Sequence, residues 1–338
     1  MLTAQPLKHQ FTDTPVNNGY AQKTSGLIEP PAAFADIVGP YDDFRGELHD
    51  KGFVVIKNAI PRERAIQYQE KAYEWLQSFP GDLDFSNPET WIAKNLPLQN
   101  GIKVYIHYGV AHEKFVWDAK QEPGVLDAFA KLWQTDELLV SFDGINITFP
   151  NRKDIPRRAA WEHIDQSPLR RGAHCIQGII NLSPSGPNDG GLVLYPKSHN
   201  YNAEFFDSRD DKSSWLPMKD LHLFTKEELA WFRAKGLQPH KPGHTLRRRA
   251  TEKSNQIRTA IYATYTPANL AEPTQLAIKN EVFEKFGSTT HWPHQYIVSR
   301  PTQAMLPDGT RDPRDRDQPR EMPEMTDKLL KLAGAKRY

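Results

Sequence analysis

The feature that most constrains the fold is a series of short, strand-like segments in the second half of the chain. They are rich in Ile, Val and aromatic residues, and clusters of Pro, Gly, Asn and Ser separate them. The segments are LLVSFDGINITFP (138–150), AAWEHID (159–165), HCIQGIINLSP (174–184), GGLVLYP (190–196) and IRTAIYATYTP (257–267). Short strands divided by turn signals favour an antiparallel sandwich or barrel over a βαβ array. We therefore expect a chain that is mainly β with flanking helices, an α+β protein.

Helical patterns surround these segments. After a short helix and a strand at Phe53 to Ile56, a helix opens at Pro61. One face of this helix repeats apolar residues at helical spacing, namely Ala65, Tyr68, Ala72, Trp75, Leu76 and Phe79. Further helices are expected from Pro123 to about Asp136 and over 272–287, where Gly287 supplies the end. These apolar faces predict helices that cover the sheet.

The organisation along the chain predicts one main domain. Residues 1–38 are polar without periodicity, and we interpret them as an irregular N-terminal arm. The domain spans 39–300, with an aromatic-rich helical insertion at about 200–240. Residues 301–338 form a charged, Pro-rich C-terminal segment with a possible last helix from 323 to 332.

Composition narrows the class of partner. The chain has 338 residues, 43 Lys and Arg, 42 Asp and Glu, and therefore a net charge of +1. This balance gives no field that attracts nucleic acid or an anionic membrane, and favours small-molecule chemistry. Cys175 is the single cysteine, so no intramolecular disulfide forms. With no signal peptide or apolar span recognised, we expect an intracellular, cytoplasmic protein; its oligomeric state is not indicated.

His163 and Asp165 are two residues apart in a strand-like segment. Residues i and i+2 of a strand project from the same face, so both side chains can share one ion. With a second histidine from another strand they would form the facial arrangement of non-haem Fe(II) oxygenases. The pair alone is weak, because carboxylates are frequent in this chain, and two polar residues on an ordinary strand remain the alternative.

Arg258 begins the strand-like segment IRTAIYATY, whose apolar residues would hold it partly buried. A buried guanidinium needs an anion. A ligand carboxylate, which Arg binds through two charge-assisted hydrogen bonds, and an internal salt bridge are both open.

Several features in the same order resemble the phytanoyl-CoA dioxygenase family of Fe(II)/2-oxoglutarate oxygenases, and fungal members most closely. The HxD pair at His163 is followed by NDGGLVLYPKSH (188–199), then by RTAIYATYTP from Arg258, and by TTHWPH at 289–294. The resemblance covers about residues 40 to 300.

This resemblance implies a double-stranded β-helix (jelly roll, cupin-like) core and an enzyme that hydroxylates a small organic substrate with O2. Fe(II) would be held by His163, Asp165 and a distal histidine, and the cosubstrate 2-oxoglutarate by Arg258. Asn146 lies where the family places an amide for the cosubstrate or for a water beside the metal. Because Asp165 would occupy a metal-ligand position, that position is not left vacant for a halide ion. The resemblance therefore implies hydroxylation rather than halogenation.

The chain departs from the family at the distal histidine. By spacing the candidate is His244, which stands 14 residues before Arg258; the weaker candidates are His240, His291 and His294. The apolar strand expected before this histidine is absent, and an arginine run (247–249) follows it, unsuited to a barrel interior. Residues 242–250 are either an artefact of splicing or frameshift, or an exposed loop.

Two alternatives follow from this departure. The first is a jelly-roll binding or scaffold protein that has lost catalysis, and metal binding would distinguish it. The second is a different metal enzyme on the same barrel, such as a cupin-type dioxygenase or isomerase, which dependence on 2-oxoglutarate would exclude. The identity of the substrate is not indicated.

Overall fold

The computed structural model describes residues 26–35, 39–155, 161–186, 191–216, 219–241, 256–295, 297 and 302–338. Its α-helices are α1 (Ala32–Ala35), α2 (Phe44–Lys51), α3 (Arg62–Gln77), α4 (Lys114–Lys120), α5 (Pro123–Trp133), α6 (Asn202–Asp207), α7 (Lys226–Ala234), α8 (Pro273–Glu284) and α9 (Asp327–Ala333). Its 3₁₀ helices are η1 (Pro88–Thr90), η2 (Ala93–Asn95), η3 (Val110–His112), η4 (Ser198–Tyr201) and η5 (Ala268–Leu270). Its strands are β1 (Val104–Tyr105), β2 (Leu138–Val140), β3 (Ile145–Thr148), β4 (His163–Ile164), β5 (Gln177–Asn181), β6 (His222–Leu223) and β7 (Arg258–Pro267).

Strand β7 organises the larger sheet. It pairs with β3 and β5 along its first half and with β2 at its end, while β1 continues the sheet from β3. Strands β4 and β6 form a separate two-stranded sheet, and all of these pairings are antiparallel. The expected α+β class with antiparallel sheets is confirmed. The expectation of a mainly β chain is wrong, because the structure is about 34% helix and 12% strand.

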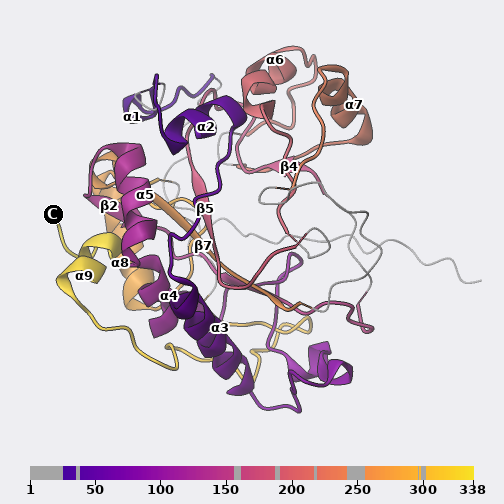
Figure 1. The fold of residues 1–338 in the computed structure, drawn as a ribbon, viewed down its shortest axis with the longest axis vertical. Helices are drawn as coiled ribbons and strands as arrows, with labels where there is room; N and C mark the ends of the chain where they lie inside the picture. The colour runs from indigo at the N-terminus through magenta and orange to yellow at the C-terminus, as the bar shows by residue number, and fades with distance from the viewer. Residues whose placement is uncertain are drawn as a thin grey trace, which may run out of the picture.

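One face of the larger sheet is apolar and covered by helices. Register places Ile145, Ile180 and Ile261 side by side on this face, and all three are buried. The ring of Tyr265 packs 4.6 Å from that of Phe129 on α5. Figure 1 shows α3, α4 and α5 along this side of β5 and β7. The helices thus bury the apolar side chains that the strands direct to this face.

The other face of the larger sheet is polar, and we call it the polar face. The register pairs Gln177 with Thr264, and Thr148 with Arg258, on this side. Its polar members are Asn146, Thr148, Gln177, Asn181, Arg258, Tyr262 and Thr264. Gln177 and Asn181 are exposed, whereas Asn146 and Arg258 are buried. A sheet face with this composition is suited to a binding site rather than to core packing.

The helical predictions are confirmed and one strand prediction is wrong. Helix α3 starts directly after Pro61 and buries Ala72, Trp75 and Leu76. Helices α5 and α8 occupy the segments expected of them. Residues 53–56 are not a strand. The β-branched run was a misleading signal, because its last two residues are exposed and no strand among the described residues pairs with it.

The insertion at 200–240 has an aromatic core of its own. Its buried members are Phe205, Phe206, Trp215, Phe232 and Leu237. Strand β6 of this insertion pairs with β4, and α6, α7 and β4 lie together at the upper right of Figure 1. The segment GGLVLYP was expected to be a strand, but its described residues make only an isolated bridge between Leu194 and His240. The insertion therefore supports the strand that carries His163.

Other predictions fall outside the described residues. Of the N-terminal arm only 26–35 is described, and His244 with all of 242–255 is not. Within the described part of the chain, no helix is long and apolar enough to cross a membrane.

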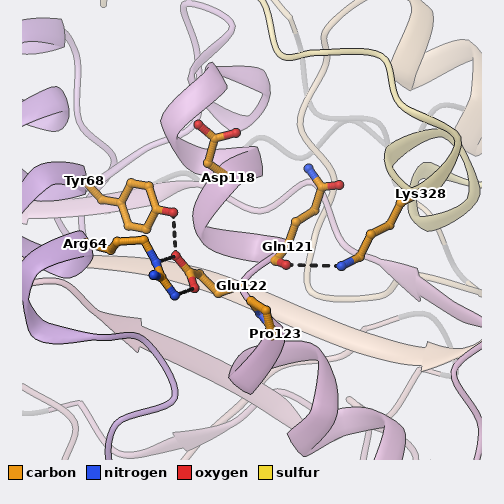
Figure 2. Close-up of a pocket in the computed structure, with 7 residues that line it drawn as sticks. All are labelled: Arg64, Tyr68, Asp118, Gln121, Glu122, Pro123 and Lys328. Atoms are coloured by element: carbon orange, nitrogen blue, oxygen red, sulfur yellow. Dashed lines mark hydrogen bonds and ion pairs between the residues drawn. The ribbon is translucent and has the colours of Figure 1, made fainter.

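A surface cavity of about 450 Å³ lies between α3, α4 and α9 (Figure 2). The Glu122 carboxylate at its floor accepts hydrogen bonds from Arg64 Nε at 2.6 Å and Nη2 at 2.8 Å, and from the Tyr68 hydroxyl at 2.6 Å. Figure 2 shows these three side chains directed at one another rather than into the cavity. We interpret the group as an ion pair that ties α3 to the start of α5, not as a ligand site.

Two lysines are completely buried beside the end of β2. Lys120 Nζ donates to the Ser141 carbonyl at 3.0 Å, and Lys279 Nζ to the Val140 carbonyl at 2.6 Å. Neither amine forms an ion pair with a carboxylate of the described residues. Burial lowers the pKa of Lys120 to about 8 and lowers the pKa of Lys279 as well.

Substitution of Lys120 by methionine is expected to remove the contribution of Lys120 to the rise of stability with alkaline pH, while Lys279, whose pKa is also lowered, keeps its own contribution. Between the folded pKa of about 8 and the ordinary value of 10.5, the unfolded chain binds the lysine proton and the folded chain does not. Stability therefore rises with pH in this window, by about 3 kcal/mol for a shift of this size. Urea unfolding at pH 7.5, 9 and 10.5 measures the rise. Lys114→Met, at an exposed lysine of the same helix, should leave it unchanged, and an unaltered rise in Lys120→Met would contradict the assignment.

Candidate metal centre

His163 is held by contacts from its own strand and from the insertion. On β4 it pairs with Leu223 of β6, and the Trp161 ring stacks on the imidazole with centroids 3.9 Å apart and planes 4° apart. His163 Nδ1 lies 2.9 Å from the Trp161 carbonyl oxygen. A carbonyl only accepts hydrogen bonds, so we assign the proton to Nδ1. This leaves the lone pair of a neutral imidazole on Nε2, the form in which histidine binds a metal.

The lone pair of His163 faces the carboxylate of Asp165. Nε2 and Oδ1 are 3.4 Å apart, and the two side chains are 27% and 34% exposed. Two acceptor atoms at this distance need a positive charge between or beside them, either a proton that makes an ordinary salt bridge or a metal ion. The geometry brings the two side chains of the HxD pair together, and an imidazole nitrogen beside a carboxylate oxygen is a pair of donors that a divalent transition metal accepts.

The described residues do not supply a third ligand. Among them, no group of three His, Cys, Asp or Glu side chains is placed to hold a metal ion. His240 packs against Phe53 with ring centroids 5.5 Å apart. His294 is buried, neither of its ring nitrogens has a hydrogen-bond partner among the described residues, and burial lowers its pKa to about 3. The candidate that spacing favours, His244, lies outside the described residues.

Arg258 is 8% exposed at the first position of β7. Its Nη1 donates to Asn146 Oδ1 at 2.6 Å, and no carboxylate of the described residues lies within ion-pair distance of its guanidinium. Of the two partners expected from the sequence, an internal salt bridge is therefore not seen in this part of the chain. A buried cation whose described partner is neutral suits an anionic ligand.

Asn146 is fully engaged in holding Arg258. Its Oδ1 also accepts from the Thr148 hydroxyl at 2.9 Å, and its Nδ2 donates to the Ile102 carbonyl at 3.2 Å. These bonds indicate a positioning role, since they hold in place the amide oxygen to which the Arg258 guanidinium donates.

The structure places the two halves of the site at opposite ends of the polar face. Asp165 bonds to Gln177, which pairs with Thr264, whereas Arg258 lies six residues earlier on β7. Six residues of strand span about 20 Å. No hydrogen bond or ion pair of the described residues joins the His163–Asp165 pair to Arg258.

Gln177 was not singled out from the sequence, yet its amide contacts Asp165 directly. Its Nε2 donates to Oδ2 of the carboxylate at 3.0 Å. The sequence contains a signal for this face. Gln177, Ile179 and Asn181 are two residues apart and therefore share one face of a strand, with a polar residue at each end of it. The contact itself depends on pairing between β5 and β7, which the sequence does not specify.

Together these features define an α+β protein with antiparallel sheets, in which the polar face carries a buried arginine at one end and, at the other, Gln177, whose amide bonds to the aspartate of a histidine–aspartate pair on the second sheet. The chain is 40% identical over 274 residues to the Ava biosynthesis cluster protein O of Aspergillus versicolor. The aligned region covers 76% of this chain and 88% of that protein. The chain belongs to the family of that protein. No protein-family profile matches the chain, and no solved structure does.

Proposed function

We propose that the protein is an Fe(II)/2-oxoglutarate-dependent dioxygenase that hydroxylates a small organic substrate. The observation that carries the proposal is the His163–Asp165 pair, in which Nε2, the ring nitrogen that does not face the Trp161 carbonyl, lies 3.4 Å from a carboxylate oxygen. The name of the Aspergillus relative refers to a biosynthesis cluster, which agrees with a small-molecule substrate. The α+β fold with antiparallel sheets is compatible with a double-stranded β-helix core, which we include in the proposal.

In this proposal the protein binds and orients, and the metal with its cosubstrate supplies the oxidation. Fe(II) and 2-oxoglutarate, when bound, provide the chemistry by which O2 and 2-oxoglutarate become succinate, CO2 and the oxygen atom of a new hydroxyl group. His163 and Asp165 hold the metal, and a third histidine, by spacing His244, completes the set. The Trp161 carbonyl keeps the proton on Nδ1 so that Nε2 stays available.

In this proposal Arg258 binds the far carboxylate of 2-oxoglutarate, which requires the His163–Asp165 pair to lie closer to Arg258 than in this structure, where about 20 Å of β7 separates the levels of Asp165 and Arg258. Asn146 holds the guanidinium in place through Oδ1, and burial excludes the water that would weaken the charge pair. Tyr262, which lies between the two ends on β7, lines the path along which cosubstrate and substrate lie in this proposal.

Turnover tests the proposal. The purified protein with Fe(II), ascorbate and O2 should convert 2-oxoglutarate to succinate slowly without substrate, and omission of Fe(II) should stop the reaction. Succinate detected by mass spectrometry at the same level with and without protein would contradict the proposal.

A second candidate is a binding protein of the same fold without catalysis. The separation of about 20 Å along β7 between the level of Asp165 and Arg258 favours it. Such a protein would bind a metal through His163 and Asp165 but would release no succinate.

A further inference from the structure

Gln177 connects the candidate metal pair to the larger sheet. The residue opens β5 and pairs with Thr264 of β7, so its backbone belongs to the five-stranded sheet. His163 lies on strand β4 of the separate β4–β6 sheet, and Asp165 is the first residue after this strand. The bond from Gln177 Nε2 to Asp165 Oδ2 therefore joins two sheets that share no strand.

The same bond fixes the rotation of the Asp165 carboxylate. Oδ2 accepts from the amide at 3.0 Å, while Oδ1 faces His163 Nε2 at 3.4 Å. A carboxylate that is 34% exposed would otherwise rotate, and each rotation away from the imidazole separates the two donor atoms. With the amide in place, one oxygen is reserved for the protein and the other is directed to the metal.

We infer that Gln177 is a positioning residue that preorganises Asp165 for metal binding. The inference rests on the proposed function, since it assumes that the pair binds a metal. An outer partner of this kind raises metal affinity by about 10–100-fold, because it removes the cost of ordering the ligand at the moment of binding. Trp161 positions His163 in the same way as Gln177 positions Asp165. In this case the partner is a backbone carbonyl oxygen and not a side-chain amide.

A merely structural role predicts a different result. Gln177 is exposed, and a solvent-exposed hydrogen bond of this type contributes little to global stability. A variant without the donor should therefore keep the melting temperature and lose metal affinity. A residue that only supports the fold would change both together.

The test is the affinity of the full-length protein for Mn(II), measured by electron paramagnetic resonance, with the melting temperature recorded for each variant. Gln177→Leu and the longer, unbranched Gln177→Met both remove the donor. Asn181→Leu is the matched control, because it removes an exposed amide from the same strand and the same face, four residues further along. We expect Mn(II) to bind about 10–100-fold more weakly to both Gln177 variants and within about 2-fold of wild type to Asn181→Leu.

Three outcomes overturn the inference, and they are distinguishable. Equal Mn(II) affinity in wild type and both Gln177 variants would show that the amide does not position Asp165, while the metal site itself stands. An equal loss in Asn181→Leu would assign Gln177 a structural role. No Mn(II) binding by the folded wild-type protein would remove the proposed function, and the inference with it.

Discussion

Replacement of His163 by alanine is expected to weaken Fe(II) binding by more than about 100-fold and to abolish succinate release. Loss of a partner that only orients a ligand already costs about 10–100-fold in metal affinity, so loss of the ligand itself costs more. In this chain the effect has a specific cause, because Nε2 of His163 is the donor atom that Asp165 faces at 3.4 Å. Anaerobic Fe(II) titration followed by the quenching of Trp161, whose ring lies 3.9 Å from the imidazole, measures the change.

His199→Ala is the matched control for this prediction. His199 Nε2 lies 3.0 Å from the His49 carbonyl oxygen, and burial lowers the pKa of its imidazole, so its role is to hold a turn. The control should bind Fe(II) as the wild-type protein does. Unchanged Fe(II) affinity in a folded His163→Ala variant would show that the pair is an ordinary salt bridge.

Replacement of Arg258 by methionine is expected to weaken 2-oxoglutarate binding by about 30-fold or more. Removal of one partner of a buried, hydrogen-bonded charge pair costs about 2–5 kcal/mol, and each 1.4 kcal/mol corresponds to tenfold in affinity. Arg258→Lys should restore little of the affinity for 2-oxoglutarate, because an ammonium group lacks the planar guanidinium that binds a carboxylate through two hydrogen bonds. The affinity of this variant for Fe(II) should stay within about 2-fold of the wild-type value, since His163 lies beyond the other end of the polar face.

Arg64→Met provides the control for this second prediction. Arg64 is half-exposed at the cavity of Figure 2, and it pairs with Glu122 far from the polar face. The control should bind 2-oxoglutarate normally. If Arg258→Met folds and still binds 2-oxoglutarate with wild-type affinity, Arg258 serves only its bond to Asn146, and the binding-protein candidate gains support.

The sequence predicts well what local periodicity controls. The face of α3 that buries Ala72 and Trp75 follows from a repeat of three and four residues, and β7 starts at the expected Arg258. In these elements the chain pattern and the environment agree, because each buries a continuous apolar stripe. His163 and Asp165 lie close together, as two residues only two positions apart can, although strand β4 ends at Ile164 and Asp165 lies in the bend that follows it.

The sequence predicts poorly what depends on distant partners. Residues 53–56 have the composition of a strand, but strand formation needs a pairing partner, and the part of the chain that the structure describes provides none for them. The bond between Arg258 and Asn146 joins residues 112 positions apart, and that between Gln177 and Asp165 joins two sheets. Both depend on registers of β7 that no short motif encodes.

The central claim is that one metal ion and one 2-oxoglutarate bind together on the polar face. Its most direct test is an anaerobic titration of the purified protein with Fe(II) and 2-oxoglutarate, recorded by visible absorption. The account predicts the charge-transfer band of an iron–keto acid chelate, saturable in both ligands and lost in His163→Ala and Arg258→Met. Absence of this band in a folded wild-type protein would contradict the account.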